Sequence, residues 1–155
     1  MSLAQLSALR LQVRQCHADL DQSAAAWLHK APGATSWSAP VRLYLHALCI
    51  EDITIQSVLR ESAPLFTSFF PNLYGPADVA ALRQYARAVY AFTDAYLADL
   101  PADGLSRVVD LRKPGFGQHT VLWVTRRFVV QELEHIAHEI SGAANHSAGR
   151  LQLVR

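Results

Sequence analysis

The chain has 155 residues, which is the length of one domain. Apolar residues make up 51% of it and charged residues 17%, and this excludes an intrinsically disordered chain, which would combine low hydrophobicity with high net charge. The formal net charge of +1 shows no basic excess of the kind that nucleic-acid-binding proteins carry. We therefore expect a single domain over residues 1–155 with no nucleic-acid partner.

The cysteines and the N-terminal residues indicate the compartment. Cys16 and Cys49 form no Cys-x-x-Cys pair, which favours a reduced, cytoplasmic protein. The first residues lack the basic and apolar regions of a signal peptide. No apolar run reaches the roughly 20 residues of a membrane span. We expect a cytoplasmic protein without a membrane partner.

Two helices are predicted in the first half of the chain. In residues 3–28 the apolar side chains recur at alternating steps of three and four, which is typical of a helix with a narrow apolar seam. Residues 38–61 open with Ser38 as a candidate N-cap and Pro40 in the first turn. Two adjacent apolar stripes in this second segment predict a helix that is buried on two sides.

Two further helices are predicted in the second half. Residues 76–100 keep the three-four spacing, with Asp78 in the first turn, where the helix dipole favours an acid, and Pro101 as the stop. The last helix opens at Thr120, after a glycine-containing loop, and its apolar residues from Leu122 to Ala144 share one face.

The two remaining connections are long for a plain bundle. Residues 62–75 are rich in aromatics, which predicts a ligand mouth or a dimer interface, and residues 103–119 contain a short β-like run at 107–111. Connections that span the length of the bundle allow an up-down-down-up order of helices. We expect an all-α four-helix bundle with two long connections.

The last helix carries the chain's only dense cluster of metal-competent side chains. His135 with Glu139, and Glu134 with His138, are pairs four residues apart, which project from one face of a helix. His46 of the second helix supplies a third donor from a facing helix. Three protein ligands with an open position make a catalytic metal site, and imidazole with carboxylate suits zinc, nickel, iron or manganese.

A structural role explains the same residues. A cluster of histidines and glutamates on an amphipathic helix is usually a solvated face. When Leu133 is placed at the centre of the apolar stripe, His135 and His138 fall on the far side of the helix. His46 has its own alternative, which is a buried histidine hydrogen-bonded within the core.

The order of several short motifs resembles the DinB/YfiT-like superfamily of four-helix bundles. Trp37-Ser38-Ala39-Pro40 leads into a helix that carries His46 and then Glu51. A third helix with residues 81–89, and a link over residues 96–110, precede the last helix with its cluster. The resemblance covers nearly the whole chain.

The resemblance implies a metal site. In that family a divalent metal is typically held by one histidine of the second helix, which His46 matches, and by two residues of the last helix, usually histidines four apart. The last helix here has no His-x-x-x-His, so three registers are open. They are His135 with Glu139, Glu134 with His138, and Gln131 with His135.

The first register is favoured, because Leu133 and Ala137 then fall on family-like apolar positions. The predicted site residues for a divalent metal are His46, His135, His138 and Glu139.

Two functions are consistent with these residues. The resemblance implies a metal-dependent enzyme that transfers a low-molecular-weight thiol, such as mycothiol, bacillithiol or glutathione, to an electrophile, with the metal stabilising the thiolate. The alternative is a non-catalytic, metal-free bundle that dimerises or binds a small ligand as a stress-response protein. We expect a homodimer.

Overall fold

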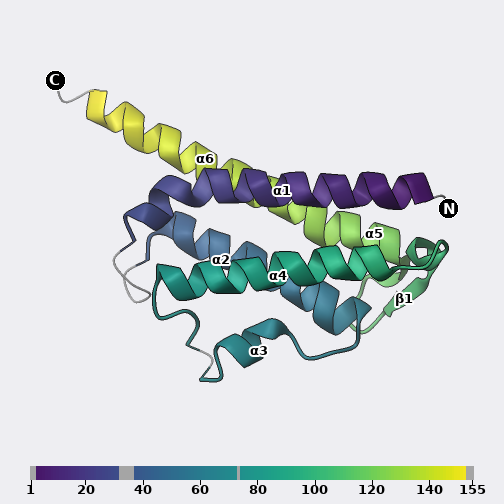
Figure 1. Cartoon of the computed structure of the whole chain (residues 1–155). Coiled ribbons are helices and arrows are strands. Elements are labelled where there is room, and N and C mark those ends of the chain that lie inside the picture. Colours follow the sequence, from purple (N-terminus) through teal and green to yellow (C-terminus); the bar gives the residue numbers. More distant parts are fainter. Residues whose placement is uncertain (1–2, 32–36, 73, 153–155) are drawn as a thin grey trace.

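The computed structural model describes residues 3–31, 37–72 and 74–152, with side chains up to residue 144. In this part of the chain, four long helices pack as a bundle, which confirms the predicted fold (Figure 1). The first helix is α1 (Leu3–His29), and the second is α2 (Ala39–Asp52), which is continued by the π-helical segment η2 (Ile53–Leu59). The third helix is α4 (Val79–Asp99). The last helix consists of α5 (Val121–Thr125), the π-helical segment η4 (Arg126–Val130) and α6 (Gln131–Gln152).

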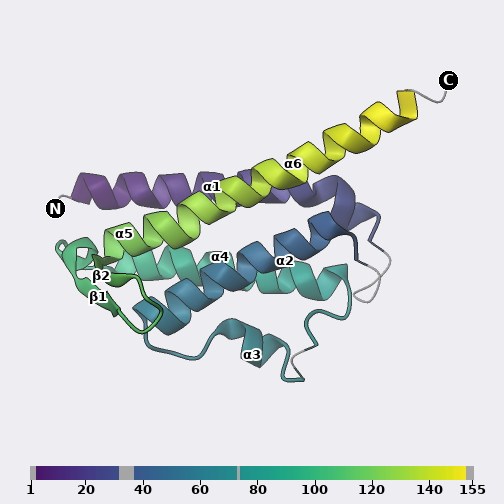
Figure 2. The same cartoon turned by 180° about the vertical axis from the view of Figure 1, so that it is seen from behind.

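The helices follow the up-down-down-up order. α2 and α4 run in the same direction, opposite to α1 and α6 (Figures 1 and 2). The connection between η2 and α4, which contains α3 (Leu65–Phe69), returns the chain along the length of the bundle. The second long connection instead stays at one end, so the expectation that both connections span the bundle is wrong for this one. It folds as η3 (Gly104–Ser106) and a hairpin of β1 (Val108–Leu111) and β2 (Gly117–Thr120).

The hairpin extends the predicted β-like run. β1 pairs antiparallel with β2 in the register Val108↔Thr120 to Leu111↔Gly117. Gly115 in the turn and Gly117 at the start of β2 have φ of 88° and 83°, a backbone conformation that glycine adopts without steric cost. The strand β2 was not predicted, because residues 117–120 are too few and too polar to show an alternating pattern.

Polar caps fix the starts of two helices. Asp78 is itself the N-cap of α4, and its Oδ1 accepts from the Ala81 N–H at 2.8 Å. Thr120 caps α5 through its hydroxyl, which accepts from the Trp123 N–H at 3.2 Å. Ser38 occupies the predicted N-cap of α2, but its side chain makes no capping hydrogen bond. Such caps satisfy backbone donors that the helix itself leaves unpaired.

The aromatic connection is packed onto the bundle. Asp52 of α2 is 1% exposed and accepts from the N–H groups of Leu65 and Phe66, at 2.9 and 2.8 Å, at the start of α3. It also accepts from the Tyr85 hydroxyl of α4 at 2.8 Å. Around Tyr85 lie the rings of three connection residues, with centroids 5.4 to 5.8 Å from its own, namely Phe66, Phe69 and Phe70. These rings therefore pack on α4, and the ligand mouth or dimer interface stays a prediction.

α6 packs against both α1 and α2, and α4 packs against the same two helices from another side (Figure 2). No helix in the described ranges is long and apolar enough to cross a bilayer. The interior is not wholly apolar, and the buried polar side chains are His17, Glu51, Asp52, Thr54, Gln56, Thr93 and Thr125. Burying such groups costs free energy unless they are hydrogen-bonded, so their partners identify the candidate site.

Candidate functional site

The predicted metal residues do not come together. His135 and Glu139 pair on α6, with Nε2 3.4 Å from Oε1, but their side chains are 65% and 44% exposed. His138 on α6 and His46 on α2 are exposed as well. Across the residues whose side chains the structure describes, no three His, Cys, Asp or Glu side chains gather closely enough to hold a metal ion. The four residues therefore do not fit the metal that the family resemblance implies.

The apolar pattern of α6 explains this placement. The buried positions of the helix, which face the rest of the bundle, are Leu133, Ile136, Ala137 and Ile140. Leu133 and Ala137 thus occupy inward positions four residues apart, and His135 and His138 are left on the solvent side. The far-side placement of the two histidines is confirmed. The buried-histidine alternative for His46 is wrong, because its side chain is exposed.

A different polar group is buried between three helices. Glu51 of α2 is 0% exposed, and its Oε1 lies 2.8 Å from Nε2 of His17 on α1. The hydroxyl of Thr93 on α4 donates to the same oxygen at 2.5 Å. The second oxygen, Oε2, has no hydrogen-bond partner in the described part of the chain. One carboxylate therefore joins α1, α2 and α4.

Tyr90 connects this buried group to a surface cleft. Its ring stacks on His17, with centroids 3.8 Å apart and planes at 18°. Its hydroxyl donates to Asp21 Oδ1 at 2.8 Å, and the Tyr44 hydroxyl donates to the same oxygen at 2.6 Å. Burial is the largest cause that raises the pKa of both tyrosines. Both phenols therefore keep their protons and act as donors to Asp21.

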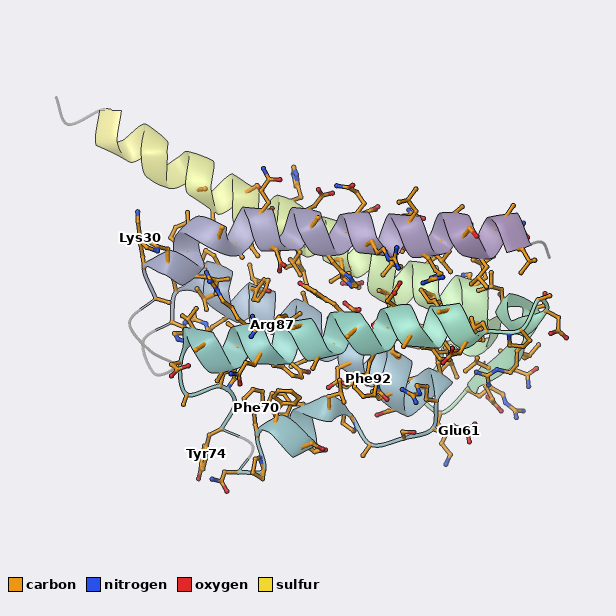
Figure 3. All side chains as sticks on the ribbon, in the orientation of Figure 1. Lys30, Glu61, Phe70, Tyr74, Arg87 and Phe92 are labelled. Carbon is orange, nitrogen blue, oxygen red and sulfur yellow. The ribbon has the colours of Figure 1, made fainter. Side chains whose placement is uncertain are left out.

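The cleft itself has a volume of about 320 Å³ and opens between α1, α2 and α4. We call it the arginine cleft, and its lining residues are Asp21, Ala25, Leu28, Tyr44, Arg83, Ala86, Arg87 and Tyr90. Arg83 and Arg87 are four residues apart on α4, so they project from the same face. Figure 3 shows Arg87 between α4 and α1. Neither guanidinium forms an ion pair or hydrogen bond with a residue that the structure describes.

The two thiols are not activated. Cys16 lies 3.9 Å from Oε1 of Glu134, and burial, followed by the charge of Glu134, raises the pKa of Cys16 to about 12. Burial also raises the pKa of Cys49. Because the thiolate is the nucleophilic form, neither cysteine is prepared to act as a nucleophile at neutral pH.

The sequence analysis did not identify most residues of the buried network and the arginine cleft. His17 was not singled out, although it lies beside the apolar seam between Val13 and Leu20. Glu51 was quoted only as part of a motif. His17 and Glu51 are titratable residues next to an apolar stripe, and this position is the sequence signal that could have identified them. Asp21 and the two arginines carry no such signal, because they are exposed and converge only in the folded chain.

The fold and its polar centre define an all-helical bundle with a charged cleft at one end of a buried hydrogen-bond network. The sequence profile described as the DinB superfamily matches residues 20–138. The chain therefore belongs to the DinB superfamily, which confirms the resemblance drawn from its motifs.

A solved structure supports the same fold. A conserved protein from Enterococcus faecalis is similar to this chain with a TM-score of 0.53 and 20% sequence identity. The alignment covers 94% of this chain and 95% of the other. None of the curated proteins gives a significant match. At this identity the likeness concerns the fold alone.

Proposed function

We propose that this DinB-superfamily protein binds a small organic molecule with an anionic group in the arginine cleft, without a protein-bound metal. The observation that carries the proposal is a pair of guanidiniums, Arg83 and Arg87, which lie in the wall of one cleft and form no ion pair with a residue that the structure describes. A guanidinium presents a planar fork of N–H donors that matches carboxylate and phosphate oxygens.

The size and composition of the cleft fit this function. Its volume of about 320 Å³ lies at the small end of the range for ligand pockets. The rings of Tyr44 and Tyr90 and the side chain of Leu28 offer apolar surface beside the charged groups. A few charged side chains on a partly apolar wall is the usual composition of a small-molecule site.

The buried network supports the cleft mechanically. Glu51 joins α1, α2 and α4, and these are the three helices that supply the walls. Tyr90 is stacked on His17 and bonded to Asp21, so the ring is held in one position before a ligand arrives. A site that is ordered in advance loses less entropy when the ligand binds.

Metal-dependent thiol transfer stays a prediction from the family. Among the described residues, no three metal-competent side chains gather, and both thiols of the chain are held protonated. The homodimer and the cytoplasmic location also stay predictions.

Thermal unfolding of EDTA-treated protein with a panel of short carboxylates tests the proposal. We expect members of the panel, which includes valerate and δ-aminovalerate, to raise the melting temperature, because a ligand that binds only the folded state stabilises it. Arg87→Gln should remove the shift that valerate produces. Arg126→Gln, which removes an exposed charge in η4, should preserve it. The proposal is overturned if no carboxylate stabilises the metal-free protein, or if binding appears only after zinc or nickel is added.

A further inference from the structure

Asp21 of α1, Tyr44 of α2 and Tyr90 of α4 present hydrogen-bond acceptors in the wall of the arginine cleft. A phenol carries one hydrogen and two lone pairs, and the hydroxyls of Tyr44 and Tyr90 both direct their hydrogen to Oδ1 of Asp21. Their oxygens lie 3.5 Å apart. Both oxygens can then only accept a further bond. Oδ2 of Asp21 has no partner among the described residues, and it too is an acceptor.

We infer that the ligand is a zwitterion that carries both an ammonium and a carboxylate group, which means an amino acid or a short peptide. This inference rests on the proposed function and specifies its ligand. An ammonium has three N–H donors, and the acceptors available to it are Asp21 Oδ2 and the two tyrosine oxygens. The carboxylate binds to the guanidiniums of Arg83 and Arg87.

The charges of the cleft favour this class over simpler ligands. Asp21 is negative and the two arginines are positive, yet Asp21 forms no ion pair with either guanidinium within the described structure. Opposite charges that stay apart in one cleft are complementary to a molecule with separated charges of its own. A phosphate brings negative charge towards Asp21, and a simple amine leaves both guanidiniums without a partner.

The packing of the tyrosine rings fixes the positions of their hydroxyl oxygens. Tyr90 is stacked on His17 and Tyr44 is 2% exposed, so both rings have fixed positions in the wall. The acceptor cluster therefore combines one carboxylate and two phenol oxygens that are fixed before a ligand binds.

Matched probes measure the separate contributions of the ammonium and the carboxylate of the ligand to binding. Calorimetric titrations of EDTA-treated protein should compare ω-amino acids of increasing length, from glycine to δ-aminovalerate, with the acid and the amine of the same chain length. For δ-aminovalerate the matched probes are valerate and pentylamine. For the best-fitting length we expect both truncated probes to bind about tenfold more weakly or worse, because each loses one charged hydrogen-bonded group.

Substitutions assign each end to its residues. Asp21→Asn should bring the affinity for δ-aminovalerate down to that for valerate. The double variant Arg83→Gln/Arg87→Gln should bring it down to that for pentylamine. Tyr44→Phe removes one acceptor without a change of charge, so it should weaken δ-aminovalerate and leave valerate unchanged. Arg126→Gln serves as the charge-matched control, and each variant must keep a cooperative melting transition.

The outcomes distinguish the inference from the proposed function. If the carboxylates bind as tightly as the amino acids of the same length, and Arg87→Gln weakens both, the zwitterion is overturned while the anion-binding cleft stands. If no probe binds the metal-free protein, both are overturned. If amino acids bind more tightly and Asp21→Asn abolishes the difference, the inference is supported.

Discussion

Substitution of Glu51 by alanine should destabilise the fold strongly. Glu51 is 0% exposed and accepts hydrogen bonds from His17 at 2.8 Å and Thr93 at 2.5 Å. Its removal leaves two buried polar side chains without this acceptor. It also removes a side chain that joins α1, α2 and α4, and leaves Asp21, with Tyr44 and Tyr90, as the other polar contact of this kind among the described residues.

The size of the effect follows from these contacts. A buried donor or acceptor that loses its partner costs about 1–3 kcal/mol, and the substitution leaves two such groups, His17 and Thr93. We expect Glu51→Ala to lower the free energy of unfolding by about 3–5 kcal/mol. For a chain of this length the melting temperature should fall by roughly 10 °C.

Urea unfolding monitored by circular dichroism measures this loss. Glu51→Gln is the conservative variant, because its amide oxygen can still accept from His17 and Thr93, and it should lose less than half as much. Glu139→Ala is the matched control on the surface, where the pair with His135 is exposed and worth about 1 kcal/mol or less. If Glu51→Ala is no more destabilising than Glu139→Ala, the role assigned to the buried network is refuted.

Three further predictions concern the Cys16 thiol and the aromatic connection. The pKa of Cys16 is raised from 9.0 to about 12. The thiol should therefore react with iodoacetamide far more slowly in the folded protein than in urea. Equal rates would contradict its burial beside Glu134. Because the folded state holds this proton more tightly, the contribution of Cys16 to stability is complete below pH 9 and is lost as the pH rises towards 12, which urea titrations at increasing pH should show as falling stability. Asp52→Ala removes three hydrogen bonds that hold α3 and Tyr85. We expect the free energy of unfolding to fall by about 3 kcal/mol and protease cleavage within residues 60–72 to become faster. An unchanged cleavage rate would show that α3 is held by its aromatic rings alone.

The fold was accessible from the sequence because its signals are local. The alternating three-four spacing of apolar residues predicted the four helices, with most bounds within a few residues of the observed ones. The end of the last helix is the exception, because α6 continues to Gln152, well beyond Ala144, and the β-like run at 107–111 became β1. The aromatic connection was located, but its packing on Tyr85 depends on Asp52, a residue of another helix. The apolar pattern along one helix does not predict a contact with a residue of another helix.

The candidate site was less accessible, for a physical reason. Residue types that bind metals cluster on the last helix, but Leu133 and Ala137 take the inward positions there and leave His135 and Glu139 in solvent. The buried polar centre, by contrast, takes one residue from each of three helices. It forms only in the tertiary structure, so no motif of fixed spacing in the sequence predicts it.

The most direct test of a metal-independent cleft is a map of amide chemical-shift changes in EDTA-treated protein on addition of δ-aminovalerate. The largest shifts should fall on the residues around Asp21, Tyr44 and Arg87, with little change at the exposed face of α6 around His135. Shifts centred on α6, or shifts that appear only when zinc is present, would contradict a ligand site between α1, α2 and α4.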